Sequence, residues 1–270
     1  MAGRRVFCMG LGAMLCGCGG AVRPPPLPPT ESVRLAAAEA AQDRVTPRRM
    51  LASGEASATV RRIAGRLNPP ALEICREIGL NRCDWFFRTS RSTTLNAAAG
   101  SDGRVEINRG VLEYARNDDE VALVMAHELA HHAADHVRQG RANQQVGAAI
   151  GGTLMGALVI AGALAGGRNS AASNRRDIEG AGRLGGRLGR LSFSRDQERE
   201  ADHLGALILF RAGYDLDKAR SFLLTMARLS DRQESGMFDS HPAGPERIAA
   251  FDQTVAQLRA TQGRIPVRPG

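Results

Sequence analysis

Residues 117–136, NDDEVALVMAHELAHHAADH, decide the fold of this 270-residue chain. Asn117 and Glu120 have the spacing of a capping box, in which two side chains satisfy free backbone N–H groups at the start of a helix. Apolar residues fill the next two turns, which favours burial. We therefore expect a long buried helix that opens at Asn117 and continues through His136.

This helix carries the motif His-Glu-Leu-Ala-His at residues 127–131. Side chains four residues apart share a helix face, so the imidazoles of His127 and His131 can reach one ion. Zinc suits two imidazoles and a carboxylate, with a fourth position left for water. Glu128 lies one position round the helix, where it can act as the base that activates this water for attack on a peptide bond. The motif alone also fits a helix whose two histidines face solvent or core.

A third ligand must come from another part of the chain. A helix expected from Ser194 to Ala212 offers Glu198, Glu200 and Asp202. Glu198 and Asp202 are four residues apart and share a face, whereas Glu200 points elsewhere. One acid of this pair is expected to bind the metal, and the other to hold an imidazole through its free N–H.

The rest of the chain predicts helices and one small sheet. Short, partly alternating segments separated by turn-forming residues indicate antiparallel strands at 83–89, 94–98 and 104–108. Further helices are expected at 30–45, 55–67, 69–78, 215–229 and 245–261. The fold class is therefore α+β and mainly α-helical.

The first residues have the parts of a secretory signal. Arg4 and Arg5 precede a short apolar run, and small residues then precede a cysteine. The pattern resembles a bacterial lipoprotein signal, which implies lipidation at Cys18 and a protein anchored without a membrane-spanning helix. Gly19 after that cysteine resembles the pattern sorted to the outer membrane. Plain export with cleavage nearby is the alternative.

We expect three parts along the chain: residues 1–18 as a lipoprotein-type signal peptide, 19–54 as a Pro-rich tether with a helix, and 55–262 as the catalytic domain. After cleavage, Cys75 and Cys83 are the remaining thiols. An exported protein can join them in a disulfide, and two buried reduced thiols are the alternative.

Residues 146–190 interrupt the domain. Residues 146–166 are apolar and long enough to suggest a membrane span, but one crossing would put His127 and Glu198 on opposite sides of the membrane. We therefore expect a Gly/Ala-rich helical insert that packs on the protein or grazes the membrane. Residues 180–190 read as a mobile loop, with a lid over the site as the alternative.

The chain is basic, with a net charge of +8. Its arginines are spread along the whole sequence, and no basic run alternates with aromatic residues as a nucleic-acid stacking surface requires. We interpret the charge as solvated surface and expect no nucleic-acid partner.

The paired motifs, His-Glu-Leu-Ala-His at 127–131 and Glu-Arg-Glu-Ala-Asp at 198–202, resemble those of the HtpX-, BepA- and CaaX-prenyl-protease-like zinc metallopeptidases (peptidase family forty-eight, gluzincin type). The resemblance covers residues 83–251. It implies that Glu198 is the third zinc ligand and that Asp202 supports a zinc histidine. Asn96-Ala97 resembles the run that precedes the family's zinc helix.

His241-Pro242, followed by Arg247, resembles the family's C-terminal His-Pro motif. In periplasmic relatives that histidine can sit at the metal, so His241 is a candidate regulatory fourth ligand. Arg247 is a candidate stabiliser of the transition state, with a helix-surface arginine as the alternative. His132 and His136 cannot join the same ion, and His203 reads as a surface or packing residue.

The resemblance implies a gluzincin-like endopeptidase that binds one Zn²⁺ and cuts misfolded or misassembled envelope proteins. The membrane helices of two branches and the tetratricopeptide array of another are missing, which favours an exported form in the periplasm, held at the outer membrane by its lipid. The alternative function is a chaperone-like envelope lipoprotein that binds clients without cutting them.

Overall fold

The computed structural model describes residues 22, 24–42, 48–79, 83–100, 102–142, 193–230, 241 and 244–264, with the single positions 145, 149, 153 and 179. The expected signal peptide, nearly all of the 146–166 segment and the 180–190 loop lie outside these residues. Among those described, no helix combines the length and apolar composition that a bilayer crossing requires.

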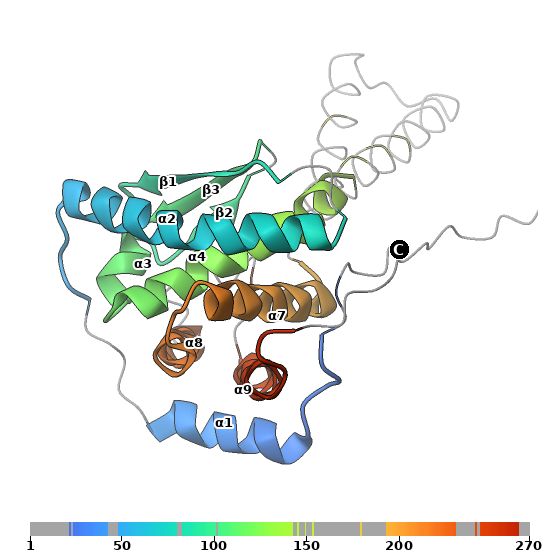
Figure 1. Cartoon of the computed structure of the whole chain (residues 1–270). Coiled ribbons are helices and arrows are strands. Elements are labelled where there is room, and N and C mark those ends of the chain that lie inside the picture. The colour runs from blue at the N-terminus through green and yellow to red at the C-terminus, as the bar shows by residue number, and fades with distance from the viewer. Residues whose placement is uncertain are drawn as a thin grey trace, which may run out of the picture.

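The fold is mainly helical with one small sheet, which confirms the predicted class (Figure 1). The helices are α1 (Thr30–Gln42), α2 (Ser53–Glu77), α3 (Arg109–Tyr114), α4 (Asp118–Ala133), α7 (Arg195–Arg211), α8 (Leu216–Ser230) and α9 (Pro245–Thr261). The strands are β1 (Phe86–Ser90), β2 (Ala97–Ala99) and β3 (Arg104–Asn108). In Figure 1 the sheet lies above α2 and α4, α7 lies below them, and α8 and α9 are seen nearly end-on above α1.

α4 is the central helix, and it packs against α2, α7, α8 and the sheet. Asn117 caps its first turn by accepting the backbone N–H of Glu120, as predicted. The side chain of Glu120 accepts the N–H of Arg116 rather than that of Asn117, so only one half of the predicted capping box forms. Every residue from Glu120 to His131 is buried. Because it is surrounded on all sides, α4 holds its polar side chains in a dry interior, where they need partners from neighbouring helices.

α7 approaches α4 closely because of a glycine. A Cβ built at Gly205 would lie 3.2 Å from the backbone nitrogen of His127. The absence of a side chain at this point lets the two backbones come together beside the motif. This contact places the first turn of α7 opposite the histidines of α4.

The sheet is mixed, so the prediction of a purely antiparallel sheet is wrong. β2 and β3 form an antiparallel pair joined by a tight turn in which Gly103 has φ +83°. β1 lies on the other side of β3 and runs parallel to it, in the order β1-β3-β2. The connection after β1 therefore crosses the end of β3 before β2 begins.

α2 is one helix of 25 residues, and the prediction of two helices over 55–78 is wrong. Pro69 and Pro70 remove two backbone donors, which normally breaks a helix. A buried stripe nevertheless continues across them, from Ile63 and Leu67 to Ile74. Burial of this stripe outweighs the lost hydrogen bonds. The helix ends at Glu77, and Gly79, which has φ +75°, follows as the expected stop signal.

α4 ends at Ala133, three residues before the predicted end. Asp135 has φ +61°, the left-handed conformation that terminates a helix. Aspartate tolerates this conformation better than most residues because its short side chain hydrogen-bonds locally. A separate helical turn begins at His136, so the direction of that side chain differs from that in a continuous helix.

The N-terminal segment packs on the domain. α1 lies against α8 and α9, where Arg220 pairs with Glu39 at 2.7 Å. Before α1, the carbonyl of Pro25 accepts a hydrogen bond from Arg199 of α7. The described N-terminal residues are thus in contact with α7, α8 and α9.

A disulfide joins Cys75, near the end of α2, to Cys83.

Candidate metal centre

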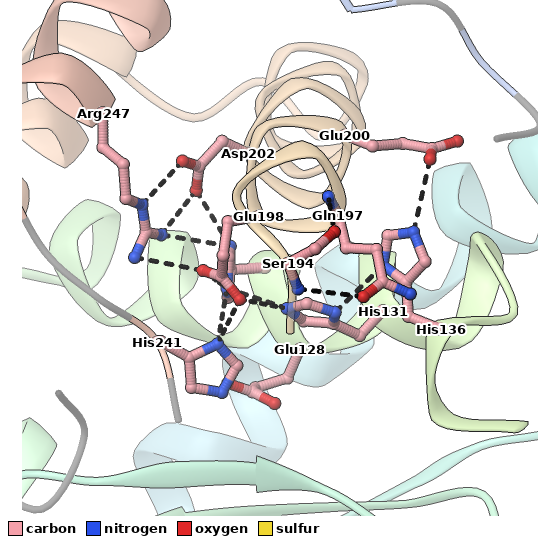
Figure 2. Close-up of polar contacts among 11 residues, drawn as sticks. Glu128, His131, His136, Ser194, Gln197, Glu198, Glu200, Asp202, His241 and Arg247 are labelled. Atoms are coloured by element: carbon pink, nitrogen blue, oxygen red, sulfur yellow. Dashed lines mark hydrogen bonds and ion pairs between the residues drawn. The ribbon is translucent and has the colours of Figure 1, made fainter. Parts of the chain in front are cut away.

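Four side chains from three parts of the chain meet beside α4. His127 and His131 come from α4, Glu198 from the first turn of α7, and His241 from the segment before α9. One donor atom from each lies within 4.8 Å of the others, and all four residues are buried. Figure 2 shows Glu198 and His241 directed toward the same point.

The distances define a compact donor set. Nε2 of His131 lies 3.1 Å from Nε2 of His127. Each of these nitrogens lies 3.3 Å from an oxygen of Glu198. Nδ1 of His241 lies 2.9 Å from Oε1 of Glu198 and 3.2 Å from Nε2 of His127. The two motifs predicted to share an ion therefore lie in one place.

A capping box fixes Glu198 at this point. The hydroxyl of Ser194 accepts the backbone N–H of Gln197, and the side chain of Gln197 accepts the backbone N–H of Ser194. Both bonds hold the first turn of α7, which carries Glu198. The ring of Phe193 stacks on that of His131, with 3.7 Å between their centroids. This start of α7 therefore fixes both the acid and one imidazole.

Asp202 and Arg247 support the His127 side. Nδ1 of His127 lies 2.9 Å from Oδ1 of Asp202. Arg247 of α9 donates to both oxygens of Asp202, at 2.7 and 2.8 Å, and its Nη1 lies 3.2 Å from Oε2 of Glu198. The guanidinium thus contacts the candidate ligand Glu198 as well as the acid that holds His127, and it is buried.

The charges of the cluster depend strongly on one another. Burial alone would lower the pKa of His127, but the carboxylates of Glu198 and Asp202 outweigh it and raise that pKa to about 9. Burial lowers the pKa of His131 well below its ordinary value. Burial would raise the pKa of Glu198, yet the surrounding histidines hold it well below its usual range. The cluster is thus built to hold positive charge between two carboxylates.

The donor set fits zinc. Two imidazole Nε2 atoms and an ionised carboxylate are the ligands of catalytic zinc sites, and the extra imidazole belongs to the same class of donor. Oε2 of Glu198 is buried, and it lies 3.2 Å from Nη1 of Arg247 and 3.3 Å from Nε2 of His127. The carboxylate is thus surrounded by positive charge and by nitrogen donors of the type that zinc binds.

Glu128 lies beside this cluster without belonging to it. Its side chain is fully buried, and neither carboxylate oxygen accepts a hydrogen bond within the described part of the chain. Nε2 of His241 lies 3.5 Å from Oε1 of Glu128. Glu128 and Glu198 therefore contact the two ring nitrogens of His241.

One relation at the site was missed by sequence reasoning. His136 does not join the four donors, as expected, but its Nδ1 lies 3.1 Å from Nδ1 of His131. Its Nε2 lies 3.3 Å from Oε2 of Glu200. The left-handed turn at Asp135 brings His136 here. No signal in the sequence indicated this contact beyond the presence of His136 and Glu200.

The remaining histidines lie apart from the cluster. His132 Nε2 lies 3.4 Å from the carbonyl oxygen of Arg104. His203 is buried between α7 and α9, where its Nδ1 lies 3.0 Å from the hydroxyl of Thr254. His203 is thus a packing residue, which is one of the two roles that the sequence predicts for it.

The chain resembles known proteins over most of this region. Residues 62–255 match the sequences described as peptidase family M48. The beta-barrel assembly-enhancing protease of Escherichia coli (strain K12) is 31% identical over 170 residues, which cover 61% of this chain and 33% of that protein. The protein of the same name from Yersinia pestis is 28% identical over 182 residues, covering 66% of this chain and 36% of its own length.

This chain spans about a third of the length of the curated relatives it matches. The family match, by contrast, includes α4, α7 and the first part of α9, and so all four residues of the cluster. The match also covers well over half of the chain. This chain belongs to peptidase family M48.

Proposed function

We propose that this chain is a zinc-dependent endopeptidase in which His127, His131 and Glu198 hold the metal. One observation carries the proposal: these three buried side chains lie together, and the buried Glu128 lies beside them. Zinc bound there would polarise the peptide carbonyl and acidify the attacking water. Family membership supports the same reaction class.

Glu128 is the general base in this proposal. Its buried carboxylate, which accepts no hydrogen bond from the described residues, can accept a proton from the attacking water and pass it to the leaving amine. Low solvent access strengthens its electrostatic effect on the developing charges. Asp202 and Arg247 hold the ligands, because their contacts are with His127 and Glu198. These contacts favour a ligand-holding role for Arg247 over stabilisation of the transition state.

The test is a comparison of wild type with Glu128→Gln on an unfolded substrate such as reduced casein. The variant keeps shape and metal ligands but cannot accept the proton, so we expect a loss of cleavage of at least about 100-fold. Equal cleavage would reject the mechanism. Binding of the substrate by a wild type that never cuts it would support the chaperone-like alternative.

His241 is proposed to keep the site closed. Its Nδ1 contacts Glu198 and its Nε2 faces Glu128, so the ring fills the space that a substrate carbonyl requires. His241→Ala is expected to raise cleavage of short peptides several-fold without a change in metal content. A fall in cleavage with intact metal content would instead make His241 part of the catalytic machinery.

We propose extended segments of envelope proteins as substrates. β2 pairs with β3 on one side and has no second partner strand among the described residues, and it packs beside α4. An extended peptide can add to such an edge. The names of the relatives, which refer to β-barrel assembly, support misassembled outer-membrane proteins as substrates. A proline scan over 94–98 that left cleavage unchanged would reject binding at this edge.

The proposed location is the periplasmic face of the outer membrane. The support is the sequence pattern around Cys18, where the cysteine follows an apolar run and small residues. Cys18→Ala should release the protein from the membrane fraction and abolish labelling by a fatty-acid analogue. Retention of label in the variant would place the lipid elsewhere.

A further inference from the structure

We propose that Glu200 and His136 are positioning residues that, through a relay of hydrogen bonds, set which ring nitrogen of His131 carries the proton, while the backbone N–H of Val22 fixes one oxygen of Glu200. The inference rests on the proposed metal site. It assigns a role to two buried residues that bind no metal themselves and to the segment that precedes α1.

The relay is a continuous chain of four groups. The backbone N–H of Val22 donates to Oε1 of Glu200 at 3.1 Å. Oε2 of Glu200 lies 3.3 Å from Nε2 of His136, and Nδ1 of His136 lies 3.1 Å from Nδ1 of His131. All four residues are buried, at 6% exposure or less. Figure 2 shows the last part of the chain, from Glu200 through His136 to His131, on the side of the cluster away from Arg247.

The carboxylate of Glu200 determines every proton in the relay. A backbone amide can only donate, so the Glu200 oxygen that it faces must accept. A carboxylate accepts at both oxygens, so Nε2 of His136 carries a proton and donates to Glu200. When the His136 ring carries this one proton, its Nδ1 is an acceptor, and Nδ1 of His131 donates to it. The Nε2 atom of His131 is left with a lone pair directed at His127 and Glu198, as a metal ligand requires.

The opposite direction of these hydrogen bonds would prevent His131 from binding metal. If the group at 200 donated to His136, then Nδ1 of His136 would donate to Nδ1 of His131. The proton of His131 would move to Nε2, which would face the metal site with an N–H instead of a lone pair. Only an acceptor at position 200 keeps His131 available. The relay is therefore sensitive to a change that leaves shape and burial almost unaltered.

Two features of the fold bring the relay together. The left-handed turn at Asp135 directs His136 back toward His131. The segment before α1 is held on α7 by the bond from Arg199 to the carbonyl of Pro25, close to the contact of Val22 with Glu200. The N-terminal segment thus reaches a metal ligand through two side chains.

The test uses Glu200→Gln in the full chain. The amide oxygen of glutamine must face the N–H of Val22, which leaves its NH₂ group to donate to His136 and reverses the relay. We expect Zn²⁺ and Co²⁺ affinity, measured by competition with a chromophoric chelator, to fall about 10–100-fold. Nitrogen NMR of the metal-free protein should show His131 protonated at Nδ1 in wild type and at Nε2 in the variant.

Val22→Pro provides the decisive second variant, because proline has no N–H. With that donor removed, the glutamine amide is free to turn its oxygen toward His136. The double variant Glu200→Gln with Val22→Pro should therefore regain most of the lost affinity, and Val22→Pro alone should stay within about threefold of wild type because the carboxylate still accepts from His136.

Glu120→Gln is the matched control. Glu120 is also buried, lies on α4 and accepts one backbone N–H, from Arg116, but it contacts no histidine of the site. We expect its metal affinity to equal that of wild type. Wild-type affinity in Glu200→Gln, or a loss that Val22→Pro does not restore, would overturn the relay. Absence of metal binding in wild type and Glu120→Gln alike would reject the proposed function, and the relay with it.

Discussion

His127 and His131 lie one turn apart on the same helix, yet different kinds of contact hold their rings. On the His127 side, an acid contacts the ring directly and a buried arginine fixes that acid with two hydrogen bonds. On the His131 side, a second histidine stands between the ring and the acid, and the last donor is a backbone N–H. The contacts of His127 depend on charge, whereas those of His131 depend on the direction of its hydrogen bonds.

This difference separates the expected effects of mutation. Loss of Asp202 on the His127 side removes two hydrogen bonds from the buried guanidinium of Arg247, so stability and metal affinity fall together. A near-isosteric change on the His131 side reverses protons without leaving a buried charge, so metal affinity falls alone.

The largest effect is expected from Asp202→Ala, which breaks the His127 side. The free energy of unfolding should fall by about 3–5 kcal/mol in urea titration, because the buried guanidinium of Arg247 loses both of its hydrogen bonds to Asp202. Metal affinity should fall about 10–100-fold. Asp252→Ala is the matched control. Asp252, like Asp202, pairs with an arginine, but its partner Arg220 meets it at an exposed site. Its cost should stay within about 1 kcal/mol. Similar losses in both variants would contradict the difference between buried and exposed pairs.

A smaller effect is expected from Gly205→Ala, which acts on both sides at once. The added Cβ would lie 3.2 Å from the backbone nitrogen of His127 and would push α7, with Glu198, Glu200 and Asp202, away from α4. Overpacking of this kind costs about 1–3 kcal/mol.

Gly65→Ala on α2 serves as the control for that variant. A Cβ at Gly65 meets nothing within 4 Å, so the change should stabilise the helix by about 0.5–1 kcal/mol. If thermal melting showed that Gly205→Ala also stabilises the protein, the close approach of the two helices would not be required.

The smallest effect concerns His203, a buried histidine of α7 that belongs to neither side. Burial lowers its pKa from 6.5 to about 4. The folded protein therefore binds this proton less readily than the unfolded chain, so the contribution of His203 to stability is complete above pH 6.5 and is lost as the pH falls toward 4. His203→Gln should remove about 1 kcal/mol of the stability difference between pH 7.5 and 5.5 in urea titrations. An unchanged pH dependence would mean that His203 is not buried in its neutral form.

Spacing along a helix was a good guide to the site, whereas backbone direction was not visible in the sequence. Residues four apart, at 127 and 131 and at 198 and 202, had to share faces once each helix formed, and the structure brings those faces together. The place of His136 depends on a left-handed residue at Asp135, which no spacing rule identifies. The proline pair in α2 gave a wrong helix break because burial on both sides of it was decided by the tertiary fold.

The same limit applies to the sheet. Turn-forming residues between the segments predicted antiparallel strands, and this holds for β2 and β3, whose pairing is local. The position of β1 beside β3 and parallel to it depends on a crossing connection and on packing against α2. The role of Gly205 was likewise hidden, because a glycine inside a helix has meaning only when the neighbouring helix is known.

The central claim is that two imidazoles of α4 and the carboxylate of Glu198 bind one zinc ion, with Glu128 left free to act on substrate. The direct measurement is the zinc content of purified wild type, Glu128→Gln and Glu198→Ala. We predict about one zinc per chain in the first two proteins and little or none in the third, since loss of one of three ligands leaves an incomplete site. Equal zinc in Glu198→Ala and wild type, or no zinc in wild type, would contradict the account.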